Sequence, residues 1–104
     1  MDLELSGKVA VVTGGSKGIG YATAHLLVRE GATVVIVARR EAALAEAAAD
    51  IARDTSEPIG TFAIDVAKPE DLDRLTEWLI VNYGRADILI NNAGINKDQL
   101  LIRM

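Results

Sequence analysis

Residues 13–20 read Thr13-Gly14-Gly15-Ser16-Lys17-Gly18-Ile19-Gly20, and this glycine-rich stretch decides the fold class. It closes a β-branched run at residues 8–13, typical of a buried strand, and opens a segment with helical apolar spacing at residues 18–30. Glycine lets the backbone turn sharply and approach an anion closely, while a helix N-terminus offers it free N–H groups. The stretch therefore predicts a phosphate-binding loop, and a glycine-rich turn that only permits tight packing is the alternative.

The rest of the chain continues the same alternation. Strands are expected at residues 8–13, 33–38, 59–65 and 87–91, and helices at residues 18–30, 41–54, 69–84 and 98–104. Alternating strands and helices pair in parallel through right-handed crossovers. We therefore expect an α/β fold with a Rossmann-type parallel sheet in the order 3-2-1-4, which is the first half of a Rossmann fold plus one strand. A ligand would then bind between the first and fourth strands, where the winding reverses.

Composition and charge limit the possible functions. The chain has 104 residues, so residues 1–104 are expected to form one dinucleotide-binding domain that ends as its fourth helix begins. It has no cysteine and one histidine, which excludes disulfides and thiol catalysis and leaves no zinc ligand set. The net charge of −4 disfavours nucleic-acid binding. Acids near the N-terminus and no long apolar run disfavour a signal peptide or membrane span, so a cytoplasmic location is expected.

Three motifs occur in the order seen in one family. The Thr-Gly-x-x-x-Gly-Ile-Gly spacing at residues 13–20, Asp65-Val66 after the third strand and Asn91-Asn92-Ala93-Gly94 after the fourth resemble the N-terminal portion of short-chain dehydrogenases/reductases. Within that family, residues 91–104 resemble the β-ketoacyl-acyl-carrier-protein reductases. The resemblance implies NADPH-dependent carbonyl reduction, with an acyl-carrier-protein substrate for a full-length relative.

The residue that ends the second strand predicts the cofactor. NAD-specific folds place an acid there to bind the ribose 2′-hydroxyl, whereas this chain has Ala38 followed by Arg39 and Arg40. A guanidinium binds a 2′-phosphate with charge-assisted hydrogen bonds, and Lys17 adds a second cation. The alternative is that both arginines are solvated residues at a helix start. Because cations are unfavourable there, two in succession indicate a nearby anion, and we expect NADP(H).

Several expected contacts have a competing structural role. The resemblance places Asp65, Asn91 and Asn92 at the adenine and ribose site of the cofactor. Asparagine also shapes turns where strands end, and we expect Asn91 and Asn92 to do both. Ser16 is a candidate helix cap as well as a ribose or phosphate contact, and Asp65 is equally well a turn cap or an adenine contact. The residues expected to bind the cofactor are Gly14, Ser16, Lys17, Gly18, Ile19, Gly20, Arg39, Arg40, Asp65, Val66, Asn91, Asn92, Ala93 and Gly94.

No catalytic residue is expected in this chain. The resemblance implies a catalytic serine and a Tyr-x-x-x-Lys pair, in which the tyrosine is the acid/base and the lysine lowers its pKa. Four positions beyond Tyr21 stands His25, and four beyond Tyr83 stands Asp87, so neither tyrosine has the lysine. No acid or serine neighbours His25 along its helix, which favours a packing or surface role for it.

A typical family member is more than twice this length. We therefore expect a fragment, a truncated or engineered form, or a short natural relic. Three functions stay open: an oxidoreductase fragment, a nucleotide-binding module without chemistry, and an oligomeric remnant that binds no cofactor. Self-association is expected as well, because the fourth strand would lack its outer neighbour.

Overall fold

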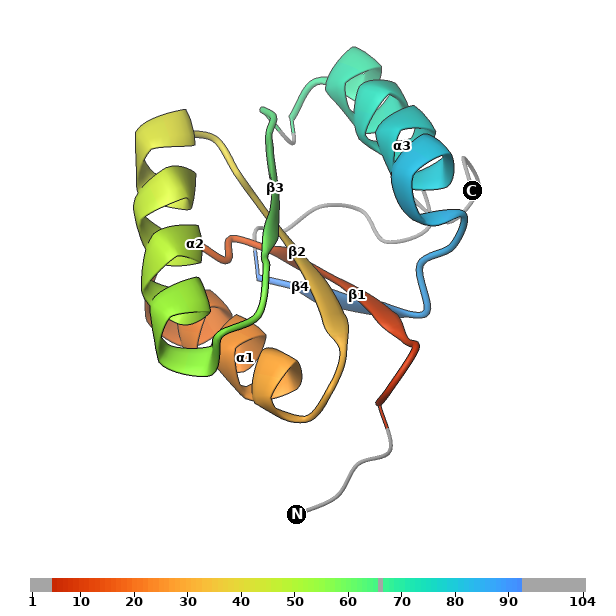
Figure 1. Ribbon diagram of the computed structural model, residues 1–104. Helices are drawn as coiled ribbons and strands as arrows, with labels where there is room; N and C mark the ends of the chain where they lie inside the picture. Colours follow the sequence, from red (N-terminus) through yellow and green to blue (C-terminus); the bar gives the residue numbers. More distant parts are fainter. Residues whose placement is uncertain (1–4, 66, 93–104) are drawn as a thin grey trace.

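The computed structural model describes residues 5–65 and 67–92, and these alternate between strands and helices as expected (Figure 1). The elements are β1 (Val9–Thr13), α1 (Gly18–Arg29), β2 (Thr33–Ala38), α2 (Glu41–Thr55), β3 (Gly60–Ala63), α3 (Pro69–Tyr83) and β4 (Ile88–Asn91). Each predicted element up to residue 92 is confirmed. The third strand is shorter than expected, because its pairing with β2 covers residues 60–63 only. The helix expected at 98–104 lies outside the described residues.

The four strands form one sheet in the order β3-β2-β1-β4, and every pair is parallel. The expected order 3-2-1-4 is therefore confirmed. The central pair runs from Val9 opposite Thr33 to Thr13 opposite Val37, and β4 pairs with β1 up to Thr13 opposite Asn91. This register brings the carboxyl ends of β1, β2 and β4 to the same edge of the sheet, where the glycine-rich loop begins.

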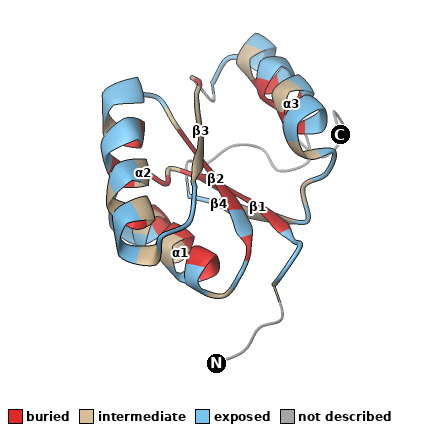
Figure 2. Ribbon diagram, in the orientation of Figure 1, coloured by how far each residue is buried: buried red, intermediate tan, exposed pale blue. Residues whose placement is uncertain are grey.

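Both faces of the sheet are covered by helices, with α1 and α2 on one face and α3 on the other (Figure 1). A strand that is buried on both sides needs apolar residues at every position, which explains the unbroken β-branched runs in β1 and β2. These strands form the buried centre of the molecule (Figure 2). The face toward α1 and α2 carries Ala10, Val12, Val34 and Ile36, and the face toward α3 carries Val11, Val35 and Val37.

Helix α1 buries only some of its large apolar residues. Its buried residues are Gly20, Ala24, Leu27 and Val28. Ile19 and Leu26, whose spacing helped to predict the helix, are 78% and 49% exposed. Of the large apolar residues in this helix, Leu27 and Val28 therefore face the sheet, whereas Ile19 and Leu26 do not.

Candidate nucleotide-binding site

The loop after β1 is held between two neighbouring strands. The Gly14 N–H donates to the Val37 carbonyl oxygen at the end of β2 (2.7 Å), and the Asn92 N–H donates to the Thr13 carbonyl oxygen (3.3 Å). The Thr13 hydroxyl donates to the Asn91 side-chain oxygen (3.0 Å). Asn91 thus contacts the end of β1 through its side chain, and Asn92 does so through its backbone N–H. Thr13 is a supporting residue that the sequence interpretation did not single out.

Two glycines of the loop are required for different reasons. A Cβ atom on Gly20 would lie 2.1 Å from the Gly14 carbonyl oxygen, so only glycine lets the first turn of α1 meet the loop this closely. Gly18 has a φ of +63°, and a Cβ there would have no atom within 4 Å. Gly18 therefore faces open space with a backbone conformation that favours glycine, as expected where a ligand approaches the backbone.

The first backbone N–H groups of α1 are placed to bind an anion. Its N-cap residue is Lys17, in extended conformation, and within the described chain no side chain caps it and no acid lies in its first turn. The first N–H groups of a helix have no partner within the helix and carry partial positive charge. The expectation that Ser16 also caps this helix is wrong, because the N-cap residue is Lys17 and no side chain makes a capping hydrogen bond there.

A cleft of about 410 Å³ lies beside this loop, over the carboxyl ends of β1, β2 and β3. It is lined by Gly14, Ser16, Lys17, Ala38, Arg39, Arg40, Ala43, Ile64 and Asp65. Six of these were predicted contacts, and Ala38 was the residue used to predict the cofactor. The crevice was expected between β1 and β4, whereas this cleft lies on the other side of β1, toward β2. The loop after β1 and the start of α2 form the walls of the cleft.

Charge in the cleft is mostly positive. Lys17, Arg39 and Arg40 are exposed cations at its rim, and Ala38 ends β2 without a charge. One carboxylate lines it among the described residues: Asp65, whose Oδ2 lies 4.0 Å from Nη2 of Arg39. This balance suits a ligand that carries more than one negative charge.

Asp65 is fixed by the loop that follows β3. Its Oδ1 accepts a hydrogen bond from the Ala67 N–H (3.0 Å), which is the turn-capping role foreseen as one of two alternatives. Its own N–H donates to Oδ2 of Asp71 in the first turn of α3 (2.8 Å), and Oδ1 of Asp71 accepts from Arg74 (3.2 Å). The Asp65 N–H, followed by the Arg74 guanidinium, holds the pKa of Asp71 below its ordinary value.

Asp71 is a supporting residue that sequence reasoning missed. The acids that follow Pro69 are favourable in the field at a helix N-terminus in any case, so their residue type alone does not single out Asp71. Their spacing from the end of the third strand was the signal that one of them could reach back to the β3–α3 loop.

The remaining predicted contacts are only partly placed. Val66, Ala93 and Gly94 lie outside the described residues. Asn91 and Asn92 are exposed at the end of β4, beside Gly14 but not in the wall of the cleft. Ile19 is exposed at the start of α1. The structure thus brings together the glycine loop, the two arginines and Asp65.

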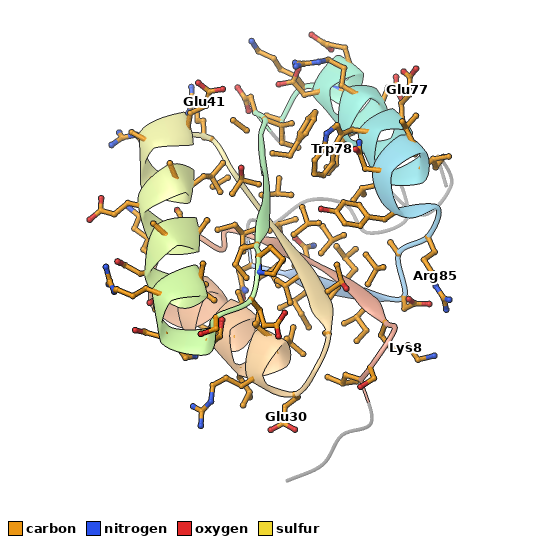
Figure 3. All side chains as sticks on the ribbon, viewed as in Figure 1. Lys8, Glu30, Glu41, Glu77, Trp78 and Arg85 are labelled. Carbon is orange, nitrogen blue, oxygen red and sulfur yellow. The ribbon has the colours of Figure 1, made fainter. Side chains whose placement is uncertain are left out.

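Tyr83 is at the far end of the sheet from this cleft. Its hydroxyl lies over Gly60, the first residue of β3, where a Cβ atom would collide with it. Trp78, which lies between α3 and β3 (Figure 3), packs edge-on against the Tyr83 ring. Burial raises the pKa of Tyr83 above 10.0, whereas an acid/base tyrosine needs a lowered pKa.

His25 is not isolated from acids as the sequence suggested. Its Nε2 lies 3.4 Å from Oδ2 of Asp54, which is 29 residues away in sequence at the end of α2. The expectation considered neighbours along α1 only, and the packing of α1 against α2 supplied the acid. The contact joins two helices, in agreement with a packing or surface role.

The described residues hold no group of side chains suited to a metal ion, and none of their helices could cross a membrane.

The first strand of the parallel sheet leads through a glycine loop into a helix without a side-chain cap, and cations follow the second strand. This arrangement defines a Rossmann-type nucleotide-binding unit. Comparison with known proteins is more specific. Residues 8–104 match the short chain dehydrogenase family, and the chain belongs to that family.

Among its relatives, the chain is 38% identical over 104 residues to the 3-oxoacyl-[acyl-carrier-protein] reductase of Chlamydia muridarum, covering 100% of the chain and 42% of the relative. It is 42% identical to the human 3-oxoacyl-[acyl-carrier-protein] reductase over 92% of the chain and 39% of the relative. The chain therefore spans about two fifths of the length of the curated relatives it matches.

Solved structures agree with the fold. L-Sorbose reductase from Gluconobacter frateurii, complexed with NADPH and L-sorbose, has a TM-score of 0.85 and 47% identity, covering 90% of this chain and 36% of that one. A short chain dehydrogenase from Shigella flexneri, complexed with NADP, has a TM-score of 0.81 and 35% identity, covering 86% of this chain and 38% of that one.

Proposed function

We propose that this chain binds NADP(H) and is the cofactor-binding part of an NADPH-dependent carbonyl reductase. The observation that carries the proposal is the group of cations at the end of β2. Lys17, Arg39 and Arg40 line one cleft with the glycine loop, and Ala38 stands where an NAD-specific fold has an acid. NADPH and NADP in the two solved relatives support the same cofactor.

The residues of the cleft fit the adenosine half of such a cofactor. A 2′-phosphate carries between about −1.5 and −2 charges at neutral pH, for which a guanidinium is a strong and often bidentate donor. The uncapped N–H groups of α1 suit the pyrophosphate, and Gly18 leaves room for its approach. When bound, NADPH would supply the hydride for carbonyl reduction, and the residues described here would bind and orient it.

The first test is cofactor preference. We expect NADPH to bind at least about tenfold more tightly than NADH, which corresponds to roughly 1.4 kcal/mol, because only NADPH offers a 2′-phosphate to Arg39 and Lys17. Arg39→Asp should erase or reverse the preference, as measured by calorimetry. Arg29→Asp, the same charge change in the last turn of α1, is the matched control and should preserve it. Equal affinities in the unmutated chain would refute the proposal.

For the substrate, we propose a 3-oxoacyl thioester carried on acyl-carrier protein by the full-length relative. The support is the name of the reductases that the chain matches in Chlamydia muridarum and in human. A nucleotide-binding module without chemistry is the second candidate. Tyr83 favours it, because burial raises the pKa of that tyrosine and its hydroxyl lies away from the cleft.

Turnover tests whether this chain has an active site of its own. We expect this chain alone to bind NADPH but not to consume it in the presence of an acetoacetyl thioester, because no described tyrosine has the lysine that would lower its pKa. Absorbance at the NADPH band is the measurement, with Tyr21→Phe and Tyr83→Phe as controls. Turnover that either phenylalanine variant abolishes would mean that the chain has an active site of its own.

We also propose that the chain associates with itself, through the edge of the sheet at β4 and the exposed apolar residues of the helices. In the described sheet β4 pairs with β1, and no described strand lies on its other side, where another chain could add a strand. Large apolar side chains are exposed on both helix layers, with Ile80 and Val81 of α3 at 49% and 77% and Ile19 of α1 at 78%. Such surfaces are typical of proteins that associate.

A further inference from the structure

The one carboxylate in the described wall of the cleft lies beside one of its three cations. Oδ2 of Asp65 is 4.0 Å from Nη2 of Arg39, and the two side chains are 27% and 80% exposed. The carboxylate is thus partly shielded by the protein, whereas the guanidinium extends into solvent.

The two partners also differ in how firmly they are held. Oδ1 of Asp65 accepts from the Ala67 N–H, and the Asp65 N–H is bound by Asp71, which is itself bound by Arg74. The carboxylate therefore has a defined position at the end of β3. Arg39 follows the last residue of β2 and carries a long side chain in solvent. Of the two groups, Arg39 is the one that is free to turn toward a ligand.

A phosphate that enters the cleft meets both groups. It is an acceptor for the same guanidinium fork that Asp65 contacts, and its charge has the same sign as that of the carboxylate. Any bond between Arg39 and the phosphate then competes with the contact to Asp65. Neutralising Asp65 would remove the competitor without removing a cation.

We infer that Asp65 is a specificity-determining residue that acts through Arg39: its carboxylate pairs with the guanidinium in the free protein and so limits the preference for a 2′-phosphate. This inference rests on the proposed function and adds a residue that opposes the cations. The three cations and Asp65 together, rather than the cations alone, would determine how strongly the site prefers NADP(H) over NAD(H).

The test uses Asp65→Asn and two small probes. Asparagine retains an Oδ1 acceptor for the Ala67 N–H and loses only the charge. The probes 2′,5′-ADP and 5′-AMP differ only in the 2′-phosphate, and calorimetry gives the ratio of their affinities. An ion pair this exposed is weak, so we expect the substitution to raise the ratio about fivefold, mainly through tighter binding of 2′,5′-ADP. Glu70→Gln, an exposed acid at the start of α3, is the control and should leave the ratio unchanged.

A second background tests whether the effect passes through Arg39. In the Arg39→Gln protein, Asp65→Asn should change the ratio less than about twofold, because the cation it competes for is gone. Thermal unfolding of each variant establishes that it is folded. A ratio that is unchanged or lower in Asp65→Asn, or an equal rise in both backgrounds, would overturn the inference. If the unmutated chain binds neither probe, the proposed function fails and this inference fails with it, whereas saturable binding with an unaltered ratio refutes this inference alone.

Discussion

Gly20 has a hydrogen where a Cβ carbon would lie 2.1 Å from the backbone oxygen of Gly14. The opposing atom belongs to the main chain, so it cannot move aside as the end of a flexible side chain could. The loop between β1 and α1 would itself have to shift. Gly18, two residues earlier, has the opposite constraint, because its surroundings are open and only its φ of +63° favours glycine.

We therefore predict different costs for alanine at the two positions. Gly20→Ala should lower the free energy of unfolding by about 2 kcal/mol or more, because the collision forces a backbone shift. Gly18→Ala should cost about 1 kcal/mol, which is the usual penalty for an L-residue in the left-handed region. Urea unfolding measures both. Equal costs would contradict the close approach of loop and helix.

At the scale of elements, the start of β4 is joined to the start of β1 by one carboxylate. Oδ2 of Asp87 accepts a hydrogen bond from the Val9 N–H (2.8 Å), while Oδ1 accepts from Nε of Arg85 (3.0 Å). The Asp87 N–H in turn donates a hydrogen bond to the Val9 carbonyl oxygen (2.8 Å). The hydrogen bond from Arg85, followed by that from Val9, holds the pKa of Asp87 below its ordinary value of 3.8.

A pKa that is lowered in the folded state means that the ionised carboxylate stabilises the fold above pH 3.8 and that this contribution is lost as the pH falls through the lowered pKa. Asp87→Asn should therefore lower the thermal midpoint at pH 7, and its difference from the unmutated chain should shrink below about pH 4. Calorimetric scans across that range measure this. Asp50→Asn, which removes an exposed pair with Arg53 in α2, is the control and should have little effect at either pH. A difference independent of pH would contradict the assignment.

Over the described residues, the sheet is covered by helices on both faces, and no described strand lies beyond β4 on the side away from β1. Large apolar residues on α3 are exposed as well. The sheet order and the position of β4 follow from connectivity, and the exposure of Ile80 and Val81 follows from which face of α3 meets the sheet.

We predict concentration-dependent association, measured by sedimentation at high micromolar concentration. Replacing Ile80 and Val81 with lysine should weaken it, because a charge would be buried in the contact. Ala49→Lys, on the exposed side of α2, is the matched control and should not weaken it. A clean monomer of the unmutated chain would refute self-association.

The amino-acid sequence by itself determined the parallel α/β fold, the strand order and the glycine loop of the cleft. These follow from local causes. The spacing of apolar residues and the β-branched runs define each helix and strand, and the short connections between them allow one arrangement of parallel strands. The cations after β2 were predictable for the same reason, because the end of a parallel strand always lies at the same edge of the sheet.

Only the tertiary structure decided which side chains meet. The exposure of Ile19 and Leu26, the contact of His25 with Asp54 and the pairing of Arg39 with Asp65 depend on how helices and loops pack together. Contacts of this kind are set by distances of a few ångströms between elements that are far apart in sequence, and neither residue type nor spacing along the chain encodes those distances.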